Sequence, residues 1–165
     1  MIYTASVPSP LGPLLLAGSD DALTGLWLPG QRYFGSGLPA EAAVAPENPP
    51  LRSAAKWLEA YFAGKRPVSG ELMLAPQGSE FQKLNWSLLT EIPCGETVTY
   101  GDLALEAEKR LGHRTFARAV GAAVGRNPIS IIIPCHRVIG ADGSLTGYAG
   151  GLDKKEWLLR HEGAI

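Results

Sequence analysis

Ile-Ser-Ile-Ile-Ile-Pro-Cys-His-Arg-Val-Ile, residues 129–139, is the stretch of this chain that indicates most about its fold and its chemistry. The short apolar run before Pro134 predicts a buried strand. Cys135 and His136 would then lie where this strand ends, at a rigid edge of the kind that holds active-site groups. A cysteine becomes reactive when a neighbouring base or positive charge favours its thiolate. Cys135 is therefore a candidate nucleophile and His136 its candidate base.

Two other interpretations of the Cys-His pair stay open on these residues alone. A cysteine after an apolar strand is usually a small buried hydrophobic residue, and Cys-His pairs also occur as metal ligands. The chain contains few residues of either type: Cys94, Cys135, His113, His136 and His161. They are too few for a disulfide framework and show no metal-ligand spacing. We expect two reduced thiols and no metal.

Composition is that of a globular protein of 165 residues, with 45% hydrophobic and 19% charged residues. This balance argues against disorder, and the length suits one ordinary domain or two small ones. No window approaches the roughly 18 uninterrupted apolar residues of a membrane span. The N-terminus also lacks a basic segment followed by an apolar one. We expect a cytoplasmic protein with no membrane partner.

Positive charge is concentrated in one part of the chain, although the net charge is only −1. Residues 109–141 contain no Asp or Glu, and the cations in this segment are Lys109, Arg110, Arg114, Arg118, Arg126 and Arg137. Such a stretch suggests a face that binds an anion, and nucleic-acid backbone is the commonest large anion. A solvated basic surface explains the charges equally well at this stage.

The first part of the chain, residues 1–78, is predicted to form a small α/β domain. Residues 2–28 alternate short apolar runs with turns, a pattern typical of antiparallel strands. Residues 29–50 are rich in proline and glycine and predict a surface loop. Helical spacing of apolar residues after Pro50 predicts a helix, and a further strand is expected at 71–75, just before the domain boundary.

Residues 79–165 are predicted to form a mostly helical second domain. Capping boxes predict two helix starts, at Ser79 with Gln82 and at Thr99 with Asp102. A third helix is expected over residues 115–125. Two helices joined by a short turn, the second with a face of small residues, are typical of a helix-turn-helix.

The last predicted helix bears on the candidate base. Its start is predicted after Asp153, with Glu156 as the capping partner. Glu162 then lies in the final turn, where the helix dipole disfavours a carboxylate, so another interaction should hold it. A histidine base needs a partner that fixes its tautomer. We predict Glu162 as that partner of His136, with His161 and Glu156 as alternatives.

Further motifs surround the Cys-His pair: Pro93–Tyr100, Arg118–Gly121, Asn127–Gly140, Gly147–Gly151 and Lys155–Gly163, with Ser9–Leu14 and Tyr61–Gly64 upstream. Together they resemble the O6-alkylguanine-DNA alkyltransferase family. The resemblance covers nearly the whole chain, strongly after residue 79. It implies a ribonuclease H-like N-terminal domain and a DNA-binding alkyltransferase domain with a helix-turn-helix.

The resemblance implies a DNA repair reaction that consumes the protein. The Cys135 thiolate would take the alkyl group from O6 of guanine, with O4 of thymine as a second candidate target, and keep it as a thioether. Displacement at an alkyl carbon needs a soft nucleophile, and we expect no metal or organic cofactor. The implied partner is double-stranded DNA containing O6-alkylguanine, bound through its minor groove by a monomer.

Motif position also assigns roles around the lesion. Tyr100 would donate to the guanine ring, and the carbonyls of Cys135 and Val138 would accept from its amino group. Backbone amides around Tyr148 and Ala149 would hold O6, since Ala149 has no hydroxyl.

The target atom lies inside the duplex, so the base must be extruded, at a cost of about a few kcal/mol. The resemblance assigns Arg118, on the second helix of the helix-turn-helix, to the vacated position in the stack. It assigns Asn127 to joining that helix to the active-site segment through backbone hydrogen bonds. The remaining predicted DNA-binding residues are Thr115, Ala119, Gly121, Arg126 and Arg137.

Two alternative functions use the same residues differently. A non-catalytic, lesion-binding alkyltransferase-like protein would share this scaffold but lack the acceptor cysteine, which is present here as Cys135. A cysteine hydrolase using Cys135, His136 and Glu162 would turn over repeatedly, but no feature of the sequence suggests an acyl substrate. The segment from Glu106 to Arg114 is longer than the family pattern.

Overall fold

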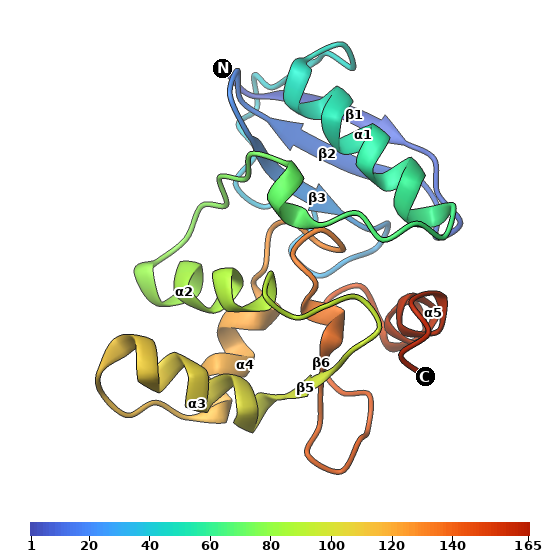
Figure 1. The fold of residues 1–165 in the computed structure, drawn as a ribbon. Helices are drawn as coiled ribbons and strands as arrows, with labels where there is room; N and C mark the ends of the chain where they lie inside the picture. Colours follow the sequence, from blue (N-terminus) through green and yellow to red (C-terminus); the bar gives the residue numbers. More distant parts are fainter. The chain divides into compact units, whose positions relative to one another are not determined.

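The computed structural model describes residues 1–165, which form two compact units (Figure 1). One unit comprises residues 1–77 with 128–132, and the other comprises 78–127 with 133–165. The predicted class is confirmed, because a small sheet and its helix make up the first unit and most helices belong to the second. Residues 128–132, predicted to lie in the second domain, belong to the first unit. None of the helices is both long and apolar enough to cross a membrane.

The first unit is built on a sheet with the strand order β3-β2-β1-β4. β1 (Tyr3–Val7), β2 (Leu14–Gly18) and β3 (Leu23–Trp27) form antiparallel pairs, as the alternating apolar runs predict. β4 (Ala43–Val44) pairs in parallel with β1. The sheet is therefore mixed, and this short strand lies within the segment that was predicted to be loop.

Helix α1 (Pro49–Phe62) packs on this sheet. Its N-terminus is capped by the Asn48 side chain, which accepts a hydrogen bond from the backbone N–H of Leu51. Two prolines occupy the first turn, where the backbone N–H that proline lacks would have no partner within the helix. Its buried face consists of Leu51, Ala54, Trp57, Leu58 and Tyr61. The strand expected at 71–75 is mostly wrong, because the chain forms the short helix η1 (Ser69–Glu71) and then a single bridge from Leu74 to Leu23.

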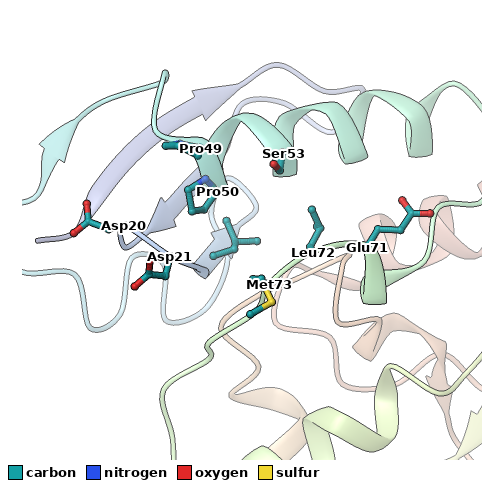
Figure 2. A pocket seen from close by; sticks show the side chains of 9 residues that line it. Asp20, Asp21, Pro49, Pro50, Ser53, Glu71, Leu72 and Met73 are labelled. Atoms are coloured by element: carbon teal, nitrogen blue, oxygen red, sulfur yellow. The ribbon is translucent and has the colours of Figure 1, made fainter.

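A pocket of about 320 Å³ lies beside the start of α1 (Figure 2). Three carboxylates line it, those of Asp20, Asp21 and Glu71, together with Ser53 and several apolar side chains. It contains no cysteine or histidine, and its negative charge would repel a phosphate backbone. This pocket is therefore not a candidate for the chemistry predicted from the sequence.

The strand predicted at 129–133 is wrong. Only Ile129 forms a β-bridge, in parallel with Leu26 of β3. Two residues later, Ile131 has a φ of 69°, which ends any extended conformation and is rare for a β-branched residue. The isoleucines are buried all the same, with Ile129 and Ile131 fully inaccessible. An apolar run indicates that a segment is buried, and here the buried segment has an irregular backbone conformation.

The second unit contains the helices α2 (Glu80–Leu89), α3 (Tyr100–Leu111), α4 (Ala117–Gly125) and α5 (Leu152–His161). Helices α2, α3 and α4 pack on one another, and the Trp86 indole Nε1–H donates to the Ala123 carbonyl at 2.8 Å. The short strands β5 (Val98–Thr99) and β6 (Val138–Ile139) pair in parallel beside them. Both predicted capping boxes, at Ser79 and Thr99, are present.

Two predicted helix starts differ in the structure. Helix α4 begins at Ala117 after Phe116, which supplies no side-chain cap. Helix α5 begins at Leu152 after Gly151, whose φ is 102°, and the capping box expected at Asp153 is absent. Gly151 can adopt this left-handed backbone without strain, so the turn geometry rather than a side chain sets the start of α5. Helix α3 continues past Glu106 to Leu111, and Gly112 then ends it with a φ of 75°.

Candidate active site

Cys135 is held at the first position of the short helix η2 (Cys135–Arg137), directly before β6. Its backbone N–H donates to the Ile133 carbonyl at 2.8 Å, and only 6% of the residue is exposed. Asn127, which follows α4, hydrogen-bonds the thiol and also donates from Nδ2 to the Ile133 carbonyl at 2.8 Å. The end of α4 is thereby joined to the turn that holds the thiol.

His136 and Glu162 meet inside the second unit. The imidazole Nε2 lies 2.6 Å from Glu162 Oε2, and neither side chain is exposed. Nε2 therefore carries the proton that it donates to the carboxylate, and Nδ1 is left as the acceptor nitrogen. Nδ1 is buried and has no hydrogen-bond partner within the protein. The structure thus contains the predicted His136–Glu162 contact, with the ring ready to accept a proton at Nδ1.

Arg137 lies in the interior and not on a DNA-facing surface, contrary to the prediction from the charge pattern. Its Nε donates to Glu162 Oε1 at 2.8 Å and its Nη2 to Oε2 at 3.1 Å. Its Nη1 donates to the Ile92 carbonyl at 2.6 Å, and the residue is only 8% exposed. Arg137 therefore neutralises Glu162 and connects η2 to Ile92, which lies just after α2 in the sequence.

Burial and the neighbouring charges have opposite effects on the pKa values of Glu162 and His136. Burial alone would raise the pKa of Glu162, but the hydrogen bonds and charges of His136 and Arg137 outweigh it and hold that pKa below its ordinary value. Burial lowers the pKa of His136 despite the neighbouring carboxylate. The resting arrangement is an ionised carboxylate, a guanidinium and a neutral imidazole.

Lys155 is the functional candidate that sequence reasoning missed. It is fully buried on α5, and its Nζ donates to the Val138 carbonyl at 2.5 Å and to the Thr146 carbonyl at 2.8 Å. Burial lowers its pKa to about 8, although the Cys135 thiolate would raise it. The sequence contained one indication that Lys155 is buried: it lies three residues before Leu158 and therefore on the same apolar face of the helix.

Opposing effects act on the pKa of the Cys135 thiol. Burial raises the pKa of Cys135, whereas the hydrogen bond from Asn127 and the positive charge of Lys155 lower it. A nearby proton acceptor therefore matters for forming the thiolate. His136, neutral and with Nδ1 available, is the nearest titratable group in sequence with that capacity.

Tyr100 lies at the start of α3, where its hydroxyl donates to the carbonyls of Thr146 at 3.1 Å and Gly147 at 3.3 Å. Burial raises its pKa, and a Cys135 thiolate would raise it further, so the phenol stays protonated. Gly121 of α4 faces the Tyr100 ring, since a Cβ there would lie 3.6 Å from a ring carbon. An added methyl group would make ordinary van der Waals contact there, so this contact does not require a glycine.

The 147–151 motif completes this side of the site. Tyr148 meets the His136 ring edge-on, with 6.4 Å between ring centroids, and both Tyr148 and Ala149 are half-buried. The Val138 carbonyl, predicted to accept from guanine, already accepts from Lys155. A carbonyl has two lone pairs, so one remains.

The other predicted DNA-binding residues lie along or beside α4. Arg118, Ala119 and Arg126 are exposed, whereas Thr115 is half-buried and donates its backbone N–H to Glu108 Oε1 at 3.0 Å. The exposed face of α4 therefore combines small residues with cations. Across the chain, no group of three or more His, Cys, Asp or Glu side chains is placed to hold a metal ion.

Comparison with known proteins identifies relatives along the whole chain. Residues 2–86 match the ribonuclease-like domain of 6-O-methylguanine DNA methyltransferase, and residues 80–164 match its DNA binding domain. The methylated-DNA–protein-cysteine methyltransferases of Methanosarcina acetivorans and Mycobacterium leprae are 48% and 47% identical, covering 99% and 98% of this chain and 99% and 93% of theirs. The crystal structure of Mycobacterium tuberculosis OGT in complex with DNA is similar, with a TM-score of 0.83 and 41% identity over 98% of this chain and 93% of that one.

Replacing Glu162 by Gln should remove a pH-dependent part of the stability. The pKa of this carboxyl is below its ordinary value of 4.5 in the folded protein, so its stabilisation is present above that pH and is lost as the pH falls. At pH 7 we expect Glu162→Gln to lower the free energy of unfolding by about 3 kcal/mol. The difference from wild type should shrink below about pH 4.5.

Denaturant unfolding measured at several pH values tests this expectation. Glu156→Gln is the matched control, because Glu156 forms only an exposed pair with Arg160 at 2.9 Å and should contribute little. A wild-type advantage over Glu162→Gln that is the same at pH 7 and pH 3 would contradict an ionised Glu162.

Replacing Lys155 by Met should slow alkylation of Cys135. Loss of the buried positive charge leaves the thiolate less stable, and we expect the rate with iodoacetamide at pH 7 to fall roughly three- to tenfold. Because the Lys155 amine loses its charge above its pKa of about 8, the difference should diminish at higher pH. Peptide mass spectrometry reports Cys135 separately, and Lys154→Met is the control for loss of one lysine from α5. If both variants slowed alkylation equally, the buried charge of Lys155 would have no specific effect on Cys135.

Proposed function

Because the chain belongs to the 6-O-methylguanine-DNA methyltransferase family, we propose that it repairs DNA by transferring an alkyl group from O6 of guanine to its own Cys135. The observation that carries this assignment to particular atoms is the buried contact of His136 with Glu162 beside that cysteine. It provides a neutral base next to a thiol in the unit that also contains the helix-turn-helix. Each molecule acts once, because the thioether is stable.

The transfer is a displacement at the alkyl carbon. The Cys135 thiol proton passes to Nδ1 of His136 through one bridging water, and Glu162 stabilises the imidazolium that forms. The sulfur–carbon bond then forms as the carbon–O6 bond breaks, and the electron pair of the broken bond returns to the guanine. The Tyr100 phenol donates the proton that the departing base takes up, and the imidazolium proton restores the phenol through solvent.

Specificity for guanine comes from groups around the thiol. The free lone pairs of the Cys135 and Val138 carbonyls accept from the exocyclic amino group, while backbone amides at Tyr148 and Ala149 hold O6. Tyr100 must exchange its hydrogen bonds with the carbonyls of Thr146 and Gly147 for one with the base. Asn127 and Lys155 keep the thiol and the Val138 carbonyl in place.

The partner is double-stranded DNA, and the helix that contacts it is α4. Its exposed small residues permit close approach to a groove, and we assign it to the minor groove, where the contacts need not depend on base sequence. Arg118, exposed in the first turn of α4, fills the position that the extruded guanine leaves. Thr115, Ala119 and Arg126 border the same surface. We propose that the protein acts as a cytoplasmic monomer.

Cys135→Ser should abolish transfer while leaving DNA affinity nearly unchanged, because a hydroxyl is a poor nucleophile of similar shape. Intact-protein mass spectrometry after incubation with an O6-methylguanine duplex should show one added methyl group in the wild type and none in the variant. Cys94→Ala should react normally. A methyl group retained by Cys135→Ser would move the acceptor role to Cys94, and repeated turnover would favour a hydrolase.

Arg118→Ala should separate reaching the lesion from reacting with it. Loss of the side chain that fills the stack should slow transfer from duplex DNA by about five- to a hundredfold, the scale of one unstacked base. Free O6-benzylguanine needs no extrusion, so its rate should hardly change. Single-turnover rates with both substrates provide the test. If both rates fell by the same factor, Arg118 would have a role in folding or in the pocket instead.

A further inference from the structure

Phe116 is a large apolar side chain at the start of α4 that none of the steps above uses. It is 63% exposed, and its carbonyl accepts from the Val120 backbone N–H at 3.0 Å, as expected of the N-cap residue of the helix. A single exposed aromatic residue needs no explanation by itself. Phe116 differs because of what surrounds it.

Arg114 and Phe116 form a pair on the protein surface. The backbone at Phe116 is extended, with φ −132° and ψ 150°, and side chains two residues apart on extended chain point the same way. The Arg114 guanidinium carbon accordingly lies 5.7 Å from the centre of the Phe116 ring. Both side chains are exposed. The pair therefore presents a cation and an aromatic ring together.

The pair continues the exposed surface of α4. Ala117, Arg118 and Ala119 follow directly and are all exposed. The intervening Thr115 donates to Glu108 Oε1, which holds the turn in place and engages the nearest preceding carboxylate. This surface is cationic and apolar, and no acidic residue occurs in the sequence from 109 to 141. Charge complementarity therefore favours a polyanion as its occupant.

We propose that Phe116 and Arg114 contact the DNA backbone beside the lesion, with the ring packed on a deoxyribose and the guanidinium bound to the adjacent phosphate. The proposal rests on the proposed function, since it takes α4 as the DNA-contacting helix. Insertion of the ring between bases is less favoured, because a wedge needs both ring faces and Arg114 lies over one of them. The pair would strengthen the binding of α4 to DNA while Arg118 fills the position that the extruded guanine leaves.

Binding of an undamaged duplex, measured by fluorescence anisotropy at several salt concentrations, tests the proposal. Phe116→Ala should weaken binding about fivefold, the effect of losing roughly half of one buried aromatic side chain, without changing the salt dependence. Arg114→Gln should lower the slope of log affinity against log salt by about one, because one phosphate contact is lost. Phe116→Leu keeps an apolar contact and should lose less than Phe116→Ala.

Leu105→Ala is the matched control, because Leu105 is 60% exposed on α3 but lies between the carboxylates of Asp102 and Glu106 in sequence. It should bind DNA like the wild type. Thermal unfolding of each variant checks the fold, and the rate with free O6-benzylguanine should be unchanged throughout.

Three outcomes would overturn the proposal. Wild-type affinity in Phe116→Ala would show that the ring makes no contact. A reduced salt slope in Phe116→Ala would mean that the ring only holds Arg114. A change in the fluorescence of a 2-aminopurine placed in the undamaged duplex, seen with wild type and lost in Phe116→Ala, would indicate insertion between bases. Undamaged DNA carries no alkyl group, so these results do not depend on transfer to Cys135, whose failure would appear only in the mass of the protein.

Discussion

The carboxylate of Glu162 is the charge on which the candidate site depends. A buried ion without a partner costs several kcal/mol, and Glu162 lies in addition at the end of α5, where the helix dipole is unfavourable. Two hydrogen bonds from Arg137 and one from His136 compensate for both effects. The interaction that makes this carboxylate tolerable also ties α5 to η2 and fixes the imidazole tautomer.

The balance of buried charge explains why a thiolate can form at Cys135. Arg137 and Glu162 cancel, which leaves the positive charge of Lys155 beside the sulfur. In the proposed mechanism, loss of the thiol proton to His136 leaves a thiolate that pairs with the charge of Lys155, and Glu162 stabilises the imidazolium. Burial opposes ionisation of any single group, but the groups together permit a proton to move between two of them.

Helix α4 has two roles in the proposed reaction. Gly121 of this helix faces the Tyr100 ring, while the exposed residues from Ala117 to Ala119 provide the surface proposed for DNA. Asn127, directly after the helix, hydrogen-bonds the thiol. A displacement of α4 would therefore change the positions of both the proposed proton donor and the nucleophile. DNA bound to this helix would in this way act on the reacting atoms.

Features that depend on neighbours in sequence could be predicted from the sequence. The capping boxes at Ser79 and Thr99 are local hydrogen bonds, so three-residue spacing was sufficient to place them. The adjacency of Cys135 and His136 is given by the chain itself, and the poor electrostatic position of Glu162 in its helix indicated that it needs a partner. The ordered series of motifs along the chain indicated the family and, with it, the two-part fold.

Features that depend on which groups become buried together were decided by the tertiary structure alone. The cations Arg137 and Lys155 look in sequence like surface residues, but packing encloses them, and each then takes partners that no spacing rule specifies, such as the Ile92 carbonyl for Arg137. The apolar run 129–133 correctly indicated burial and wrongly indicated a strand, because hydrophobicity does not determine the backbone conformation in which a segment is buried. The physical reason is the same in both cases: local preferences set the caps and the helices, whereas desolvation is a property of the packed chain.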